Sequence, residues 1–139
     1  MKKVLSILVA TAMMFSFGVC TYADDTDTNY NDQISPQYSY TERISSTISK
    51  SGTTLTCTST VSGFSGITKI TITQELQKKN GTSWPSINGR GTTVFSSRAY
   101  FVQPYSNVAK GTYRVKTIAK VYKGSNYETV TAYSNSVTV

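Results

Sequence analysis

Histidine is absent from the sequence, and this absence restricts the chemistry that the protein can perform. Histidine is the commonest general base in enzymes and the commonest transition-metal ligand, so both roles lose their usual residue. Carboxylates are also scarce, because only Glu42, Glu75 and Glu128 follow residue 36. Their spacing brings no two of them together, as a hydrolase with a pair of catalytic carboxylates would need. We therefore expect a protein that is not an enzyme and that holds neither a metal nor a cofactor.

Long hydrophobic runs are missing except at the start of the chain. Residues 1–3 include two lysines, residues 4–19 carry no charge, and residues 20–23 end in alanine ahead of two aspartates. This three-part layout is typical of a secretory signal peptide over residues 1–23, with cleavage between Ala23 and Asp24. The sequence thus predicts a secreted protein, either extracellular or associated with the cell envelope.

Two alternatives to cleavage after Ala23 stay open. A retained membrane anchor would need about 20 apolar residues, and the uncharged run is shorter. No transmembrane segment is therefore expected after processing. Lipidation at Cys20 would hold the protein at the membrane surface, although the bulky Val19 directly before it fits a lipoprotein signal poorly.

Cysteine is rare, since the chain has two and only Cys57 remains once residues 1–23 are removed. An intramolecular disulfide is therefore excluded in the mature protein, and packing and sheet hydrogen bonds must supply its stability. The remaining 116 residues (139 − 23) are enough for one domain with a single core.

Negative charge is concentrated in a short leader. Four of the seven acids lie within residues 24–32, in a polar stretch without apolar periodicity. We expect residues 24–37 to form a disordered acidic leader and residues 38–139 to form the folded domain. In that domain twelve Lys and Arg oppose three Glu, a net charge of +9 (12 − 3). Such a charge attracts polyanions, which for a secreted protein are envelope polymers or extracellular glycans and not intracellular nucleic acid.

No part of residues 38–139 has the period of a helix, and alternating Thr, Ser, Val, Ile and Tyr predict strands throughout. Turn residues divide this region into about seven strands, which we expect near residues 44–48, 55–61, 67–79, 84–89, 93–102, 112–123 and 130–139. Short strands separated by turns predict an all-β, antiparallel sandwich.

Alternation along each strand also assigns the side chains that face the core. The inward residues are expected to be Ile44, Ser46, Ile48, Leu55, Cys57, Ser59, Val61, Ile70, Ile72, Leu76, Phe95, Ala99, Phe101, Tyr113, Val115, Thr117, Ala119 and Val121. A loop is expected at residues 103–105. In the last strand Val130 and Ala132 lie on one face while Val137 and Val139 lie on the other, so we expect a bulge near Ser134-Asn135.

Two segments favour an immunoglobulin-like sandwich. Thr54–Cys57 resembles the second strand of such domains, in which a cysteine points into the core. Lys110–Val115 resembles the turn into their sixth strand, in which a tyrosine braces the corner. Val115 occupies the position of the partner cysteine, so the resemblance implies that Cys57 is a reduced, buried thiol. The tryptophan of the third strand is also missing, which argues against a true antibody-type domain.

The signal peptide together with Gly66–Ile72, Leu76–Lys79, Ser83-Trp84 and Gly111–Val115 resembles small secreted proteins of Gram-positive gut and soil bacteria. The resemblance covers roughly residues 38–139. It implies an immunoglobulin-like fold and secretion, and because no activity is assigned to that family it implies no function.

One surface is a candidate for binding. In an immunoglobulin-like sandwich the third, sixth and seventh strands are neighbours, and their outward faces would combine Lys69, Arg114, Lys116, Lys120, Tyr122, Tyr127 and Tyr133. Cations interleaved with tyrosines can hold a polyanion by charge and a sugar by stacking. Lysine and threonine are equally what an antiparallel sheet presents to water, so a purely solvated face stays open as the alternative.

These observations predict a secreted, non-catalytic binding module for an anionic cell-envelope polymer or an extracellular glycan. Two rival functions share its small size, basic charge and export. One is a secreted toxin or antimicrobial factor that acts on the membranes of competitors. The other is a surface structural subunit that assembles by edge-to-edge pairing of its first or last strand. The oligomeric state is left open.

Overall fold

The computed structural model describes residues 38–139, and its regular elements there are all strands. They are β1 (Thr41–Ser51), β2 (Thr54–Gly63), β3 (Lys69–Lys78), β4 (Ser86–Val94), β5 (Arg98–Tyr105), β6 (Thr112–Lys123), β7 (Asn126–Tyr133) and β8 (Val137–Thr138). The expected signal peptide, its cleavage site at Ala23 and Asp24, and the acidic leader lie outside the described residues.

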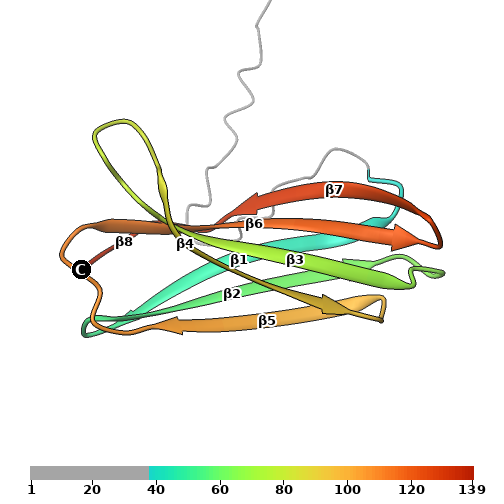
Figure 1. Ribbon diagram of the computed structural model, residues 1–139, viewed down its shortest axis with the longest axis horizontal. Coiled ribbons are helices and arrows are strands. Elements are labelled where there is room, and N and C mark those ends of the chain that lie inside the picture. The colour runs from blue at the N-terminus through green and yellow to red at the C-terminus, as the bar shows by residue number, and fades with distance from the viewer. Residues whose placement is uncertain (1–37) are drawn as a thin grey trace, which may run out of the picture. The chain divides into compact units, whose positions relative to one another are not determined.

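The strands form two sheets that face one another. The first sheet has the order β1-β2-β5, and the second has the order β4-β3-β6-β7 with β8 also paired to β6. Every pairing is antiparallel. Figure 1 shows the two layers, with β6 and β7 above and β2 and β5 below. The prediction of an all-β antiparallel sandwich is confirmed, with seven longer strands and a two-residue eighth.

Alternation in β2 and β6 builds the centre of the core, because each strand turns every second side chain toward the other sheet. The residues predicted to face inward on these two strands are fully or almost fully buried: Leu55, Cys57, Ser59 and Val61 on β2, and Tyr113, Val115, Thr117, Ala119 and Val121 on β6. Cys57 is a free thiol, as predicted.

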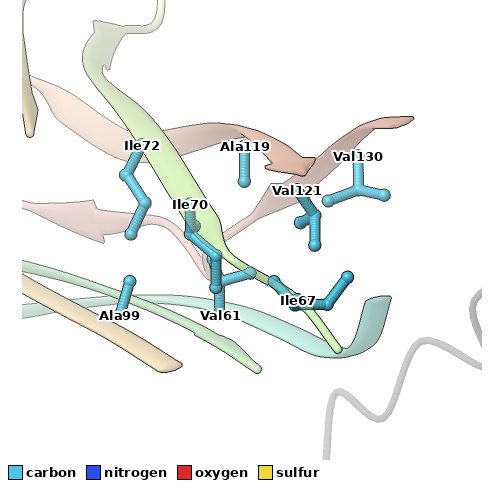
Figure 2. Packing of buried hydrophobic residues seen from close by; sticks show 8 residues of the cluster. All are labelled: Val61, Ile67, Ile70, Ile72, Ala99, Ala119, Val121 and Val130. Atoms are coloured by element: carbon cyan, nitrogen blue, oxygen red, sulfur yellow. The ribbon is translucent and has the colours of Figure 1, made fainter. Parts of the chain in front are cut away.

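A polar layer divides the core into two hydrophobic clusters. One cluster, drawn in Figure 2, consists of Val61, Ile67, Ile70, Ile72, Ala99, Ala119, Val121 and Val130. The other consists of Leu55, Cys57, Leu76, Tyr105, Tyr113 and Val115. Along β2, β3 and β6 the residue between the two clusters is Ser59, Gln74 and Thr117 respectively, and all three are fully buried.

Hydrogen bonds join this layer into a chain that crosses between the sheets. Gln74 Nε2 donates to Ser59 Oγ at 2.8 Å, and Ser59 Oγ lies 2.7 Å from Thr117 Oγ1. Thr117 Oγ1 donates to Ser46 Oγ at 2.9 Å, and Ser46 Oγ donates to the Val115 carbonyl at 3.3 Å. Each hydroxyl can thus donate one bond and accept one, which offsets the cost of burying it.

The structure corrects the prediction for residues 84–105. A single strand was expected at 93–102, but a turn at residues 95–97 separates β4 from β5. Phe95, expected in the core, is 82% exposed on this turn. The expected loop at 103–105 is instead the end of β5, where Tyr105 is buried. Pro104 is accommodated because β5 is an edge strand that pairs with β2 alone.

The last predicted strand is interrupted where a bulge was expected. β7 ends at Tyr133 and β8 begins at Val137, and both pair with β6. Ser134 Oγ accepts a bond from the Val115 amide at 2.7 Å, so a side chain replaces a backbone partner at the break. The change of alternation that led to this expectation is observed, because Val137 and Val139 pack against the core cluster that contains Cys57.

Tyr113 makes the bracing contact expected of it. Its hydroxyl donates to the Ala109 carbonyl at 2.5 Å, which ties the start of β6 to the preceding loop. Such a contact is a feature of immunoglobulin-like corners. The immunoglobulin-like topology itself stays a prediction.

The polar chain yields a test of the core. Thr117→Val keeps the size of the side chain but removes the hydroxyl that joins Ser59 to Ser46. Buried groups then lose partners, and we expect the free energy of unfolding to fall by about 1–3 kcal/mol, measured by urea denaturation. The matched control is Thr129→Val on the exposed side of β7, expected to change it by less than about 0.5 kcal/mol. Equal stabilities for the two variants would contradict a structural role for the chain.

Candidate functional site

The seven residues proposed as a binding surface all lie on the outer face of the second sheet. We call this surface the outer face; it is formed by the side chains of β3, β6 and β7 that point away from the first sheet. The strand order β3-β6-β7 makes these strands neighbours, as predicted. Register then sets Tyr122 between Lys69 and Tyr127, and sets Lys116 opposite Tyr133.

Four of these residues form one group, the tyrosine cluster, near the end of β6. Lys69 Nζ lies 4.0 Å from the centre of the Tyr122 ring. Tyr122 and Tyr127 are 5.1 Å apart between ring centres and inclined at 41°. Lys120 Nζ lies 5.2 Å from the centre of the Tyr127 ring. Both ammonium groups are within the range of a cation–π interaction, so the tyrosines hold the lysines near the sheet.

A second group, the arginine stack, lies at the other end of β6. The guanidinium carbon of Arg114 is 4.4 Å from the centre of the Trp84 ring and 4.5 Å from that of Tyr133. Gln77 Oε1 accepts a hydrogen bond from Arg114 Nε at 2.8 Å. Two aromatic rings and one amide therefore restrict this side chain, which would otherwise sample many rotamers.

Trp84 belongs to the arginine stack, although it was not predicted to lie on the binding surface. It lies in the connection between β3 and β4, which is closed by a bridge between Asn80 and Ser83. Gln77, near the end of β3, pairs with Arg114 across the sheet. The chain reverses after β3, so the side chain of Trp84 can lie over Arg114. The Asn80-Gly81 turn signal was the available clue, because it sets the next residues beside the end of β3.

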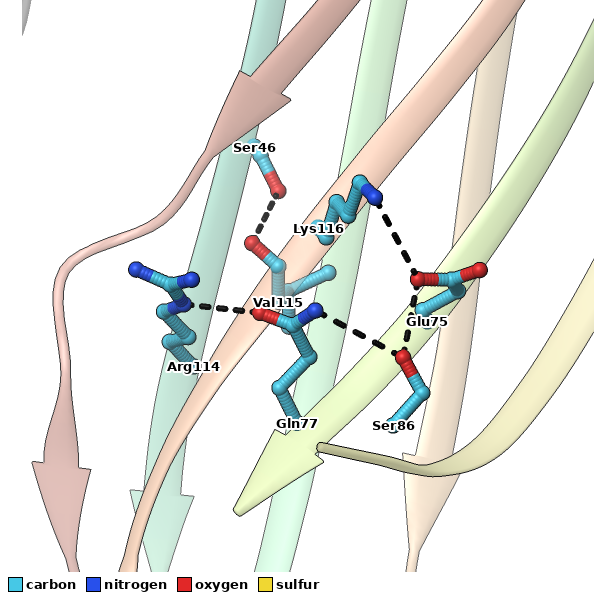
Figure 3. Close-up of polar contacts among 7 residues, drawn as sticks. All are labelled: Ser46, Glu75, Gln77, Ser86, Arg114, Val115 and Lys116. Atoms are coloured by element: carbon cyan, nitrogen blue, oxygen red, sulfur yellow. Dashed lines mark hydrogen bonds and ion pairs between the residues drawn. The ribbon is translucent and has the colours of Figure 1, made fainter. Parts of the chain in front are cut away.

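Charge on the outer face is positive. Lys69, Arg114, Lys116 and Lys120 oppose Glu75, which gives a net charge of +3 (4 − 1). Lys116 Nζ lies 3.9 Å from Glu75 Oε2, and Ser86 Oγ donates to the same carboxylate oxygen at 2.9 Å, as Figure 3 shows. Lys116 is therefore partly neutralised, whereas the other three cations have aromatic partners.

The two groups are far apart along one strand. Eight residues separate Arg114 from Tyr122 (122 − 114), about 26 Å at the roughly 3.3 Å that a strand rises per residue. Between them the outer face presents the Lys116–Glu75 ion pair, Ile118 and the threonines Thr71, Thr73, Thr129 and Thr131. The surface thus offers two cationic, aromatic contact points separated by an ion pair, one isoleucine and several threonines.

The three carboxylates of the described region have separate surroundings. Glu75 faces outward on β3, and Glu42 is exposed on β1. Glu128 accepts hydrogen bonds from the backbone amides of Ser39, Tyr40 and Thr41 at 3.0, 2.7 and 2.5 Å. Its carboxylate therefore fixes the start of β1. No group of three His, Cys, Asp or Glu that could hold a metal occurs within residues 38–139.

Cys57 is unsuited to nucleophilic chemistry. It is fully buried beside Leu55 and Val115. Desolvation by burial raises the pKa of its thiol from 9.0 to about 12. A thiolate is the reactive form, so at neutral pH the side chain behaves as a small hydrophobe.

Comparison with known proteins adds no relative. No protein-family model, curated protein or solved structure matches the chain. The resemblance to small secreted proteins of Gram-positive bacteria therefore stays a prediction. Within residues 38–139 no helix is long and apolar enough to cross a membrane.

Burial of Cys57 predicts a pH effect on both reactivity and stability. At pH 8 we expect no reaction with a colorimetric disulfide reagent until a denaturant unfolds the chain. The folded thiol has the higher pKa, so its contribution to stability is complete below pH 9 and is lost as the pH rises from 9 toward about 12. The difference in unfolding free energy between wild type and Cys57→Ala, measured across pH 8–11, isolates this contribution. A difference independent of pH would contradict it.

Proposed function

We propose that this protein is a secreted, non-catalytic binding module whose outer face holds an anionic cell-envelope polymer or an extracellular glycan. The observation that carries the proposal is the gathering of Lys69, Arg114, Lys116 and Lys120 with four aromatic rings on one sheet face. Export rests on the signal peptide read from residues 1–23.

The chemistry of the face suits an extended ligand. Two contact points about 26 Å apart exceed the size of a single sugar, and a polymer chain can reach both of them. The ammonium groups supply attraction to negative charge. Tyr127 and Tyr133, residues that are 52% and 40% exposed, can stack on a sugar. Contacts of this kind depend on charge and are weakened by salt.

We also propose an immunoglobulin-like topology for the sandwich. β2 and β6 lie in opposite sheets, and Cys57 and Val115, at the positions of the usual disulfide, pack in the same core cluster. The bond from the Tyr113 hydroxyl to the Ala109 carbonyl supports this assignment.

Binding to purified cell-wall material tests the function. Residues 24–139 should be retained at low salt and released at moderate salt, and Lys116→Glu/Lys120→Glu should lower retention at low salt about tenfold or more. Arg43→Glu/Lys110→Glu is the matched control, because it makes the same change of charge at exposed residues away from the outer face. This control should retain more than half of wild-type binding.

Two outcomes would contradict the proposal. Retention that is indifferent to salt, or no retention at all, would exclude charge-driven binding to the wall. An equal loss of retention for the two double variants would show that binding depends on the net charge of the protein and not on the outer face.

Edge-to-edge assembly is the second candidate, and the structure favours β4 for it. β4 pairs with β3 alone, is exposed over most of its length and carries one charged residue, Arg90. Edges of β1 and β7, by contrast, contact each other across the sandwich. A long edge without lysine is open to pairing with another chain.

Light scattering over a concentration series tests assembly. If β4 pairs between copies, the apparent mass should rise with concentration, and Asn88→Lys should suppress the rise by placing a charge on the exposed edge. A constant monomer mass for the wild type would exclude this candidate.

A further inference from the structure

Arg114 differs from the lysines of the outer face because its charged group is held in one orientation. Its guanidinium carbon lies over both the Trp84 and Tyr133 rings, at 4.4 and 4.5 Å. Its Nε donates to Gln77 Oε1 at 2.8 Å. Gln77 is itself 6% exposed, and its Nε2 donates to Ser86 Oγ at 3.5 Å, so its side chain is held by burial and by a neighbour.

The hydrogen bond to Gln77 uses one of the donors of Arg114. A guanidinium has five N–H groups in one plane, and Gln77 takes the one on Nε. In Figure 3 the bond to Gln77 comes from Nε, and no dashed line joins either Nη nitrogen to the residues drawn. The ion pair on this face joins Lys116 to Glu75. Within residues 38–139 no carboxylate lies within ion-pair distance of Arg114.

We propose that Arg114 is the anion-recognition point of the outer face, where its Nη groups donate two parallel hydrogen bonds to a carboxylate or phosphate group on a sugar or polyol chain. The inference rests on the proposed function and sharpens it by naming the ligand's chemical group. Bidentate pairs of this kind are shorter and stronger than ordinary hydrogen bonds, and they fix the orientation of the ligand. A guanidinium that is already ordered loses little further freedom when it binds.

The planar guanidinium of Arg114 can orient an anionic group, whereas a lysine ammonium can only attract it. A lysine at position 114 would keep the positive charge but would offer a flexible point charge without a planar pair of donors. Lys116 and Lys120 would attract the same polymer through charge alone. Gln77 is a positioning residue, since it acts on the ligand through the orientation of Arg114.

The test compares variants that conserve charge. Affinity is measured for polygalacturonate, which carries carboxylates, for poly(glycerol phosphate), which carries phosphodiesters, and for uncharged dextran. We expect Arg114→Lys to weaken binding of the preferred anionic polymer about tenfold or more. Arg43→Lys makes the same substitution at an exposed residue of β1, away from the outer face; as the matched control it should change affinity less than about twofold. The polymer that shows the larger Arg114→Lys effect identifies the source of the oxyanion.

A second variant keeps the arginine and removes its support. Gln77→Met has a similar size but no acceptor for Nε, so we expect about threefold weaker binding with the same dependence on salt. Thermal unfolding of each variant establishes that it is folded before affinity is compared.

The outcomes distinguish this inference from the proposed function. Salt-sensitive binding by the wild type that Arg114→Lys and Gln77→Met leave unchanged would overturn the role of Arg114 and leave the proposed function standing. If the wild type binds neither anionic polymer and no wall material, both fail. Equal binding of dextran and the charged polymers would overturn anion recognition.

Discussion

The two sheets are held in one register by the chain of buried polar groups between them. Gln74, Ser59 and Thr117 lie on β3, β2 and β6, and each would be costly to bury without its neighbours. A shift of any of these strands by one residue would expose its hydrophobic side chains and break the chain. The hydrophobic clusters on either side supply most of the apolar burial. The polar layer between them fixes which side chains face outward.

The outer face depends on that register. If Thr117 points inward, Lys116 and Ile118 must point outward, and the other cations of β6 follow by alternation. The tyrosine cluster and the arginine stack are therefore carried mainly by strands, with Trp84 the member supplied by a connection. Side chains on strands are held more firmly than side chains on loops, which suits the proposed contact points because a ligand would meet them already ordered.

The alternation of inward and outward side chains along the strands made much of the fold predictable. The errors lie where that alternation is interrupted or where a connection determines the contact. β6 was predicted with its observed bounds, because five inward residues alternate without interruption. Phe95 was wrongly predicted to face the core because it alternates in step with Ala99 and Phe101. The chain turns at residues 95–97, which leaves Phe95 exposed. The seven surface residues were predicted from the alternation of side chains along the strands. The stacking of Trp84 on Arg114 could not be predicted in this way, because Trp84 lies in the connection between β3 and β4. Gln74 was overlooked because a buried amide interrupts an apolar pattern.

Trp84 gives the arginine stack an optical property. It is the one tryptophan in the sequence, so the indole emission of the whole chain comes from a ring in contact with Arg114. Ligand bound beside that guanidinium would alter the polarity and the charge around the indole. Tryptophan fluorescence of the unlabelled protein therefore reports on this end of the sheet.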